Sequence, residues 1–382
     1  MSENQERKNG NYLLQDPWVD ETFEKIEKKL LRTAVSARDK IPYTTVDGVF
    51  DDKSREAPWW WTNGFWGGLM WLMYQQTGKE TFRITAETSE KSMDAALEKY
   101  YDRLHHDVGF MWHILSGVSW RITKNEASRT RNLYAANLLA GRFRMKGNYI
   151  RAWNRPDAKY WTIIDTMMNI PLLYWASEDS GDDRFKNIAM AHADTAMRDH
   201  VRPDGSVAHI VVHDPETGEA VETLQGQGSG VGSSWSRGQA WAIYGFVLSY
   251  IHTGEEKYLN TAKSVAHYFI ANIYTDFLPL IDFRAPKEPV VYDSTAGAIA
   301  ACGLIEIAKN VPEYEKDLYL SAAVRLLKSM DLKFCDYSDE EDAILKGGSG
   351  AYSGDIDMPI IYGDFFFTEA ILKLMGSEFL PW

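Results

Sequence analysis

Two aspartates in apolar surroundings are the residues of this sequence best suited to acid–base chemistry. Asp165 stands in the run WTIIDTMMNIPLL, and Asp107 stands in HHDVGF. A carboxylate in an apolar run is either a helix N-cap or an acid that burial keeps protonated, and both interpretations of Asp165 stay open. Two carboxylates that face one cleft are the usual equipment for breaking glycosidic bonds. The pair therefore predicts glycan chemistry, provided that the fold brings both residues together.

Other reaction chemistries have weaker support in the sequence. His105, His106 and Asp107 are metal-ligand types, but no second cluster has ligand spacing. His209 and His213 would share a face only on a helix, and their context HIVVH indicates a strand. The chain also lacks the GxSxG motif of a serine nucleophile. We therefore expect no metal site.

A Gly- and Ser-rich segment, GSSWSRGQAW, combines aromatic and cationic residues. Trp235 and Trp241 flank Arg237 and Gln239. Tryptophans most often pack in a core, but beside an arginine in such a loop they suit a sugar platform with a carboxylate clamp. The segment therefore predicts part of a binding site for an acidic sugar.

The composition excludes several classes of function. Lys and Arg number 41 and Asp and Glu number 54 among 382 residues, which gives a formal net charge of −13. Such a surface repels a phosphate backbone, so we expect no nucleic-acid partner, and an anionic substrate must be small or met by a local cationic pocket. The two cysteines, Cys302 and Cys335, imply no disulfide framework, and Cys302 fits buried packing. The N-terminus is polar and no apolar run approaches the roughly 20 residues of a membrane span, which predicts a cytoplasmic protein.

Helical apolar periodicity dominates the chain and predicts the elements that must position these residues. The expected helices are Pro17–Ala37, Gly64–Gln76, Glu80–Leu104, Met111–Thr123, Glu126–Met145, Thr166–Glu178, Asp183–Val201, Arg237–His252, Glu256–Tyr274, Thr295–Lys309, Glu313–Met330 and Asp364–Met375. One joint recurs: an apolar helix ends at Gly or Asn in a left-handed cap, and a more polar helix follows with acidic residues. It is expected at Gly78, Asn125, Gly181, Gly254 and Asn310. This spacing is typical of a repeated helical hairpin.

The helices alternate between two types. Segments such as NGFWGGLMWLMY are apolar nearly all round and indicate buried inner helices, whereas EKYLNTAKSVAHYFI is amphipathic. Six inner–outer pairs predict an all-α fold, an (α/α)6 barrel, over an open helical solenoid, because an inner-type helix at GDFFFTEA would close the ring. The alternation in SVAHIVVHDPETGEAVET predicts a short β insertion. We expect a single catalytic domain over 1–382.

Polar and aromatic clusters precede the inner helices, where loops at one end of a ring would meet. They are WWWTNGFW (59–66), LHHDVGFMW (104–112), IRAWNRPD (150–157), TIIDTMMNIP (162–171), GSSWSRGQAW (232–241), VYDSTAGA (291–298) and YGDFFF (362–367). Because each cluster precedes an inner helix, we expect all seven to line one funnel at the same end of the barrel, and we expect the active site there.

These motifs, in this order, resemble glycoside hydrolase family 88, the unsaturated glucuronyl hydrolases. The similar segments are WTNGFW, HHDVGF, RAW, IIDTMMNIPLL, HIVVHDPETG, QGSGVGSSWSRGQAWAIYGF, DSTAGAIAACGLIEIA and IYGDFFF, which run from residue 61 to 367. The resemblance implies an (α/α)6 barrel without metal or cofactor. The implied substrate is an oligosaccharide with a 4,5-unsaturated uronic acid at its non-reducing end, made by lyases from glycosaminoglycans such as chondroitin or hyaluronan.

The resemblance also implies roles for individual residues. Asp165 matches the general acid/base and Asp107 the second essential carboxylate. Substrate contacts are implied for Trp61, Trp153, His209, Gln227, Trp235, Arg237 and Trp241. The implied reaction is hydration of the C4=C5 enol ether, which differs from displacement at the anomeric carbon.

The segment just before the last inner helix differs from the family pattern. In some relatives this segment carries serines and a lysine that contact a sulfate group of the substrate. The segment KGGSGAYSGDIDMP keeps Ser349 and Ser353, but Asp355 is acidic and Lys346 is its only cation. The resemblance therefore does not extend to a preference for sulfated substrates.

Two alternatives remain beside this hypothesis. An unsaturated rhamnogalacturonyl hydrolase acting on pectin fragments shares the fold and the reaction. A non-catalytic glycan-binding protein belongs to another class, but a binder gains nothing from burying carboxylates. Asp107 and Asp165 in their motifs favour the glucuronyl enzyme. The sequence does not indicate the oligomeric state.

Overall fold

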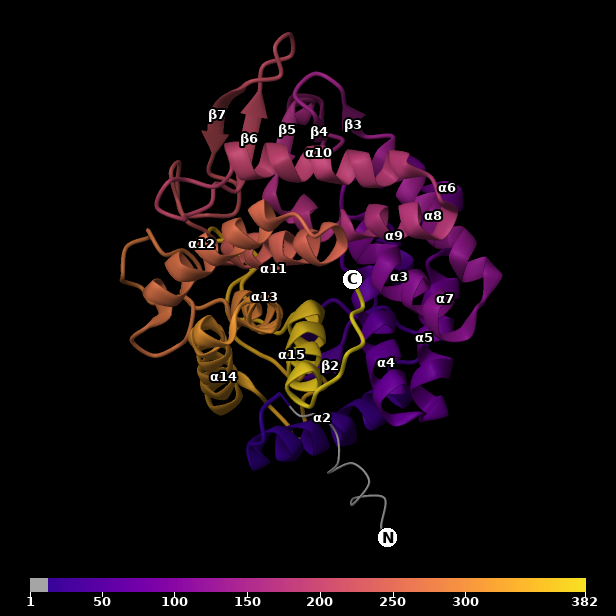
Figure 1. Ribbon diagram of the computed structural model, residues 1–382. Helices are drawn as coiled ribbons and strands as arrows, with labels where there is room; N and C mark the ends of the chain where they lie inside the picture. Colours follow the sequence, from indigo (N-terminus) through magenta and orange to yellow (C-terminus); the bar gives the residue numbers. More distant parts are fainter. Residues whose placement is uncertain (1–12) are drawn as a thin grey trace.

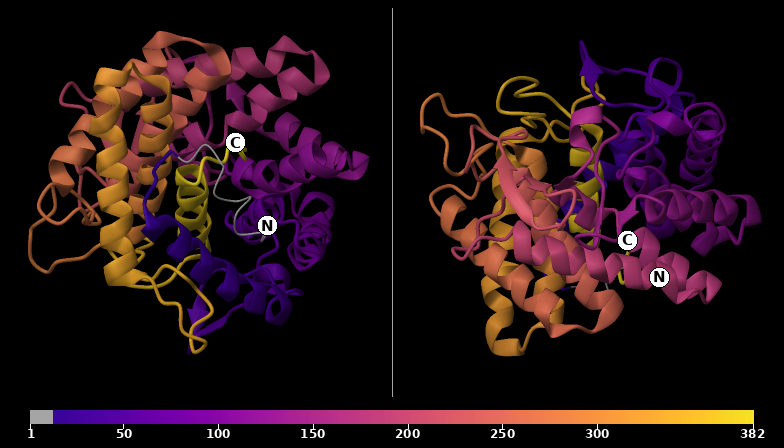
Figure 2. Two further views of the ribbon diagram at one scale, coloured as in Figure 1. Left: turned by 60° about the horizontal axis from the view of Figure 1, so that its bottom comes forward. Right: turned by 90° about the horizontal axis from the view of Figure 1, so that it is seen from above.

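The computed structural model describes residues 13–382, and its helices form two concentric rings (Figure 1). The inner segments are α4 (Asn63–Thr77), η2 (Gly109–Gly117) with α7 (Val118–Thr123), α9 (Pro171–Ser180), α11 (Ser236–Thr253), α13 (Ser294–Asn310) and α15 (Ile361–Leu374). Each contacts the next, and α15 returns to α4, so the ring is closed. Figure 2, left, shows α15 in yellow, enclosed by the other helices. The predicted (α/α)6 barrel is confirmed.

The outer helices cover this ring. They are α2 (Pro17–Ser36), α5 (Glu80–Ser92), α8 (Glu126–Ala140), α10 (Asp183–Asp199), α12 (Glu256–Ile273) and α14 (Glu313–Phe334). Each packs on an inner neighbour: α5 on α4, α8 and α10 on α9, α12 on α11, α14 on α13, and α2 on α15. All residues of α11 from Ser236 to Ser249 are buried, whereas α12 keeps an exposed face, as the two sequence types predict.

The recurring joint is confirmed at its three glycines. Gly78, Gly181 and Gly254 end inner helices with φ of 67°, 71° and 73°, the left-handed cap that glycine adopts without steric cost. At Asn310 the left-handed cap is not found, because the C-cap of α13 (Ser294–Asn310) is Val311 with φ of −107°. At Asn125 the assignment is wrong by one residue. Lys124 takes the left-handed conformation, and Asn125 is instead the N-cap of α8, where its side chain accepts the backbone N–H groups of Ala127 and Ser128.

Two outer helices are shorter than expected. The predicted helix Glu80–Leu104 breaks after Ser92 into α6 (Asp94–Lys99) and η1 (Tyr101–Arg103), a break that carries no Gly or Pro signal. The predicted helix Glu126–Met145 ends at Ala140, and the chain turns at Gly141 into a hairpin of β3 (Phe143–Arg144) and β4 (Tyr149–Ile150).

Two inner helices begin differently from the prediction, both beside the catalytic candidates. The helix expected from Met111 begins at Gly109 as the π-helix η2, whose wider turn a 3.6-residue periodicity does not reveal. The helix expected from Thr166 is a 3₁₀ segment, η4 (Ile164–Met168), and α9 starts only at Pro171. Proline suits this first position because its missing N–H would be unpaired there anyway.

The predicted β insertion is confirmed and belongs to a three-stranded antiparallel sheet. The hairpin consists of β6 (Ile210–His213) and β7 (Ala220–Leu224), and β5 (Trp161–Ile163) pairs with the other edge of β6. A further hairpin joins β1 (Thr45–Val46) to β2 (Val49–Phe50). The short strands β1–β5 were not predicted, because two or three residues are too few to show alternation.

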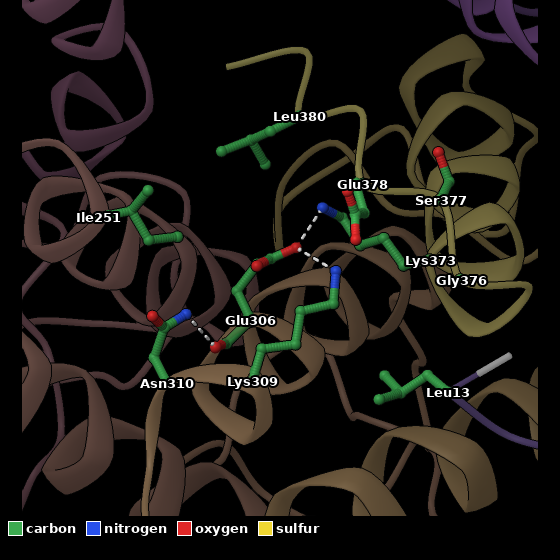
Figure 3. Close-up of a pocket in the computed structure, with 10 residues that line it drawn as sticks. All are labelled: Leu13, Ile251, Glu306, Lys309, Asn310, Lys373, Gly376, Ser377, Glu378 and Leu380. Atoms are coloured by element: carbon green, nitrogen blue, oxygen red, sulfur yellow. Dashed lines mark hydrogen bonds and ion pairs between the residues drawn. The ribbon is translucent and has the colours of Figure 1, made fainter. Parts of the chain in front are cut away.

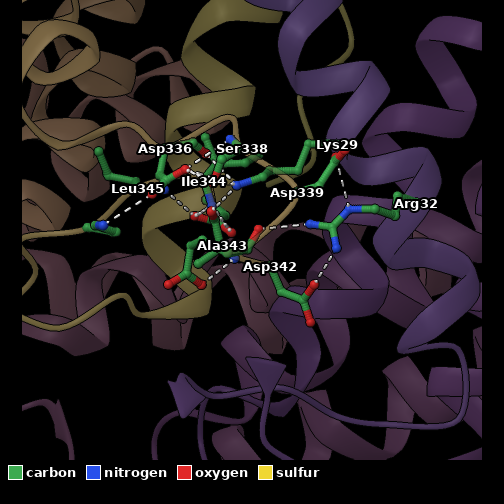
Figure 4. Close-up of polar contacts among 12 residues, drawn as sticks. Lys29, Arg32, Asp336, Ser338, Asp339, Asp342, Ala343, Ile344 and Leu345 are labelled. Atoms are coloured by element: carbon green, nitrogen blue, oxygen red, sulfur yellow. Dashed lines mark hydrogen bonds and ion pairs between the residues drawn. The ribbon is translucent and has the colours of Figure 1, made fainter. Parts of the chain in front are cut away.

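The first outer helix fastens the segment that leads to the last inner helix (Figure 4). Lys29 on α2 donates to the carbonyl oxygens of Asp336 and, at 2.8 Å, of Ala343. Arg32 donates to the Asp342 carboxylate at 3.0 Å and to the Glu341 carbonyl at 2.8 Å. These contacts join parts of the chain more than 300 residues apart. They hold the loop over 336–345 against the start of the barrel.

One cluster of buried apolar side chains extends from Val19 to Trp382. Cys302 and Cys335 are unpaired and Cys302 is fully buried, as predicted. The assignment of 1–382 to a single domain stays a prediction that this shared core supports. Between residues 13 and 382, no helix is both long and apolar enough to cross a lipid bilayer.

Candidate active site

A cleft of about 530 Å³ opens at the end of the barrel where the inner helices begin. Its lining residues are Trp60, Trp61, Asp102, Arg103, His105, His106, Asp107, Trp153, Asn154, Arg155, Asp165 and Gln227. Nine of them come from four of the seven predicted clusters, whereas Asp102 and Arg103 lie on η1 and Gln227 lies in the Gly-rich loop. The structure thus brings both aspartates into one cleft.

Asp165 lies on the 3₁₀ segment η4. This segment directly follows β5, the strand that pairs with β6. Its side chain caps no helix, so the N-cap interpretation is wrong. The side chain is 15% exposed, and its Oδ1 is buried without a hydrogen-bond partner among residues 13–382. An oxygen shielded in this way is free to carry a proton to a substrate bound in the cleft.

His209 stands behind Asp165, with 3.5 Å between its Nε2 and the Asp165 Oδ1. Its Nδ1 accepts the backbone N–H of Gln227 at 2.9 Å. A neutral imidazole has one N–H, so the proton of His209 lies on Nε2 and faces Asp165. This arrangement offers Asp165 a donor when the carboxylate is ionised.

Asp107 has a different environment and is buried. Asn169 donates to its Oδ1 at 3.2 Å, and His105 Nδ1 and His106 Nε2 lie 3.2 and 3.4 Å from its Oδ2. Burial alone would raise the pKa of Asp107, but the two histidines and Asn169 lower it below the ordinary value. Asp107 is therefore an anion at neutral pH. The two carboxylates have the unequal surroundings that suit one acid and one stabilising charge.

Asn169 connects the two aspartates, although the residue was not among the predicted site residues. Besides its bond to Asp107, its Nδ2 donates to the Asp165 carbonyl at 3.1 Å, and its Oδ1 accepts the Phe110 N–H at 2.9 Å. Gly109 permits this approach, because a Cβ there would lie 2.6 Å from the Asn169 Cα. The signal that could have found it is an amide residue four positions after Asp165, just before the proline that starts α9.

Aromatic side chains form one wall of the cleft. Trp61 is half-buried and packs 5.2 Å from the Tyr362 ring and 5.4 Å from the Phe110 ring, and Trp153 lies 6.0 Å from Trp161. Flat apolar faces beside carboxylates are the surfaces on which sugar rings stack. Trp61 and Trp153 therefore lie where a sugar in the cleft can contact them, as the family resemblance implies.

Trp235, Trp241 and Arg237 lie behind the lining residues, each at most 1% exposed. Arg237 donates to Asp293 at 2.6 Å and to the carbonyl oxygens of Ser349 and Gly350, and its guanidinium stacks 4.4 Å from the Trp235 ring. Trp235 in turn packs 4.4 Å from the His209 ring. In this conformation the three residues support the site from within the protein, and their direct substrate contacts stay predictions.

The two predicted serines have different positions. Ser349 is buried and its hydroxyl donates to the Tyr292 carbonyl at 2.7 Å, whereas Ser353 is exposed. Neither lines the cleft. Gln227 links their loop to the site, because its side chain donates to the Gly350 carbonyl at 2.6 Å.

His105, His106 and Asp107 place three ligand-type atoms within 4.8 Å of one another. The His106 Nδ1 faces the Thr166 hydroxyl at 2.6 Å, and burial lowers the pKa of His106 to about 4, so this histidine is neutral. The group thus has a role in holding Asp107, and the absence of a metal stays a prediction.

A second cavity of about 430 Å³ lies at the opposite end of the barrel, where α11, α13 and α15 end (Figure 3). There Glu306 accepts from Lys309 at 3.1 Å and from Lys373. These charges compensate one another, and no predicted site residue lines this cavity. The candidate active site is therefore the cleft at the other end.

Replacing Gly226 by alanine is expected to lower kcat/KM by about tenfold or more, because a Cβ would lie 1.9 Å from the His209 Nδ1 and displace the ring from Asp165. Gly232 is a matched control: it also has positive φ in the same loop, but an added Cβ has no neighbour within 4 Å. Steady-state kinetics of G226A and G232A should separate the clash from backbone strain. Equal losses of kcat/KM in both variants would show that displacement of His209 is not the cause.

A closed barrel whose cleft places two aspartates beside aromatic faces suits the hydrolysis of glycosidic bonds. The model of Glycosyl Hydrolase Family 88 matches residues 34–278, and the chain belongs to this family.

Named relatives agree with this assignment. The chain is 38% identical over 323 residues to the unsaturated glucuronyl hydrolase of Bacillus sp. (strain GL1), covering 82% of this chain and 86% of the relative. It is 33% identical over 333 residues to the unsaturated chondroitin disaccharide hydrolase of Streptococcus pyogenes serotype M1, covering 82% and 80%. The crystal structure of unsaturated glucuronyl hydrolase from Streptococcus agalactiae, 29% identical, superposes with a TM-score of 0.89 over 100% of this chain and 97% of that one. A mutant of that enzyme was solved in complex with dGlcA-GalNAc6S.

Proposed function

We propose that this protein releases 4,5-unsaturated glucuronic acid from the non-reducing end of glycosaminoglycan oligosaccharides such as chondroitin or hyaluronan disaccharides. The observation that carries the proposal is the pair Asp165 and Asp107 in one cleft, with unequal surroundings. The names of the relatives support the same substrate class. The acidic sugar is small, so the net charge of −13 does not prevent its entry.

The reaction follows from the two environments. Protonated Asp165 delivers its proton to C4 of the C4=C5 enol ether, and positive charge develops at C5 and the ring oxygen. Anionic Asp107 stabilises that charge. Water adds at C5 as it loses a proton to Asp165, which regenerates the acid. The resulting hemiketal opens and releases the remaining sugar, while the Nε2–H of His209 faces Asp165 in its ionised state.

The remaining predicted residues form two groups in this proposal. Trp61, Trp153 and Gln227 line the cleft and contact the sugar directly. His209, Trp235, Arg237, Trp241, Ser349 and Ser353 do not line the cleft in this conformation, and their substrate contacts stay predictions. The protein uses no cofactor and acts in the cytoplasm, as the sequence predicts.

Isotopic labelling tests the proposed chemistry. Reaction in heavy water is expected to leave deuterium at C4 of the ring-opened product, and reaction in oxygen-18 water to label C5, with carbonyl exchange measured in parallel. A displacement at the anomeric carbon would place oxygen-18 there and leave C4 unlabelled. Mass spectrometry and NMR of the products distinguish the two outcomes, and label found only at the anomeric carbon contradicts the mechanism.

A further inference from the structure

A third hollow, of about 410 Å³, opens directly beside the catalytic cleft. Its lining residues are Tyr101, Asp102, Leu104, Leu138, Gly141, Arg142, Phe143, Arg144, Arg151 and Asn154. It shares Asp102 and Asn154 with the cleft. We refer to it as the arginine pocket, after Arg142, Arg144 and Arg151.

The three arginines of this pocket lack acidic partners. Among residues 13–382, none of them forms an ion pair with a carboxylate. Arg144 stacks 4.5 Å from the Tyr160 ring, and the Nε of Arg151 is buried without an acceptor in the described chain. In a protein of net charge −13, three such cations in one hollow mark a place suited to an anion.

Arg142 and Asn154 build the wall between the pocket and the cleft. Arg142 donates to the carbonyl oxygens of Ala152 at 2.6 Å and Arg151 at 2.8 Å, and to the Asn154 Oδ1 at 2.8 Å. The Asn154 Nδ2 donates to the carbonyl oxygens of Asp102 and Leu104, both at 2.8 Å. The pocket is therefore a fixed feature of the fold.

The exposed fractions of the side chains show which residues lie deep in the catalytic cleft and which lie at its opening. In the cleft, the side chains of Asp107 and Asp165 are 10% and 15% exposed, whereas those of Arg103 and Arg155 are 60% and 61% exposed. The aspartates thus form the floor and the arginines the rim. A glycan whose terminal sugar reaches the floor leaves the cleft past its rim, and the arginine pocket adjoins the cleft at Asp102 and Asn154, which line both hollows.

We propose that the arginine pocket is a subsite for an anionic group, a uronate carboxylate or a sulfate, on a sugar beyond the first leaving sugar of a longer oligosaccharide. This inference rests on the proposed function, because it requires that the unsaturated terminus occupy the cleft. Planar guanidinium groups bind carboxylate and sulfate through paired hydrogen bonds. Burial and then Arg151 lower the pKa of Arg142 to about 10, and a bound anion would favour its charged form.

Kinetics on two substrate lengths test the subsite. R144Q and R151Q, singly and together, are assayed on an unsaturated disaccharide and on unsaturated tetrasaccharides from hyaluronan, which carries carboxylates alone, and from sulfated chondroitin. Arg142 is left intact because it holds backbone carbonyls. K146Q is the matched control, since Lys146 lies on the same hairpin but faces Glu216 at 3.0 Å outside the pocket.

The expected result is a loss of about tenfold in kcat/KM for tetrasaccharides in each pocket variant, with disaccharide kinetics and K146Q unchanged. A loss on both tetrasaccharides assigns the pocket to the carboxylate, and a loss on the sulfated one alone assigns it to sulfate. Equal losses on disaccharide and tetrasaccharides, or none on either, overturn the subsite. Failure of the wild-type protein to turn over any of these substrates would instead overturn the proposed function.

Discussion

Replacing Asp165 by asparagine is expected to lower kcat on an unsaturated glucuronyl disaccharide by about 10²–10⁴-fold, because an amide cannot deliver a proton to C4 and recover one from water. The substitution is nearly isosteric, and Oδ1 of Asp165 has no hydrogen-bond partner among residues 13–382 that would be lost. The fold and much of the substrate affinity should therefore persist. Loss of the ultraviolet absorbance of the conjugated double bond measures turnover.

D157N is a suitable control for this experiment. Asp157 is exposed, pairs with Arg155 at 2.6 Å and does not line the cleft, so removal of its charge should leave turnover nearly unchanged. Thermal unfolding followed by circular dichroism checks that both variants are folded. A folded D165N with nearly normal kcat would exclude Asp165 as the acid.

The second large effect is expected at Asn169. Replacement by aspartate keeps an acceptor for the Phe110 N–H, removes the donor to Asp107 and adds a negative charge 3.2 Å from it. A misplaced reacting group costs about 10² in rate, so we expect kcat/KM to fall by that order. The added anion also raises the pKa of Asp107.

The sign of the pH effect follows directly. In the wild type the pKa of Asp107 lies below the ordinary value, so Asp107 stays ionised and active into acidic solution. In N169D the carboxylate takes up a proton at higher pH, and the acidic limb of the kcat/KM profile should shift upward. N137D adds the same charge on the exposed face of α8 and should leave the profile in place. A uniform loss in N169D without any shift would indicate a structural role alone.

The sequence predicted the barrel because its determinants are local. Apolar faces of inner helices, the acidic first turns of outer helices and the glycines at 78, 181 and 254 each depend on residues within a few positions. Asp107 and Asp165 could be chosen for the same reason, since their apolar neighbours are adjacent in the chain. The resemblance to a family then supplied roles that spacing alone could not.

The remaining features depend on contacts that adjacent residues do not encode. Asn169 acts through bonds to Asp107 and Phe110, about 60 residues away. The burial of Arg237 depends on Asp293 and on the loop at Ser349, which the ring brings together. The arginine pocket likewise forms only when the β3–β4 hairpin folds over the loop around Asp102. The apolar periodicity of the sequence carries no information about such contacts between distant residues.

The fastening of α2 to the segment over 336–345 has a consequence for how the protein is made. Lys29 meets its partners 307 and 314 positions later, so the barrel cannot close until nearly the whole chain has left the ribosome. At roughly 5–20 residues per second, α2 and α4 wait on the order of 15–60 s for α15. During that time the apolar face of α4 that α15 will cover stays open to solvent. The nascent chain therefore has a long interval in which molecular chaperones can bind it, and the latest contacts to form are those that complete the ring.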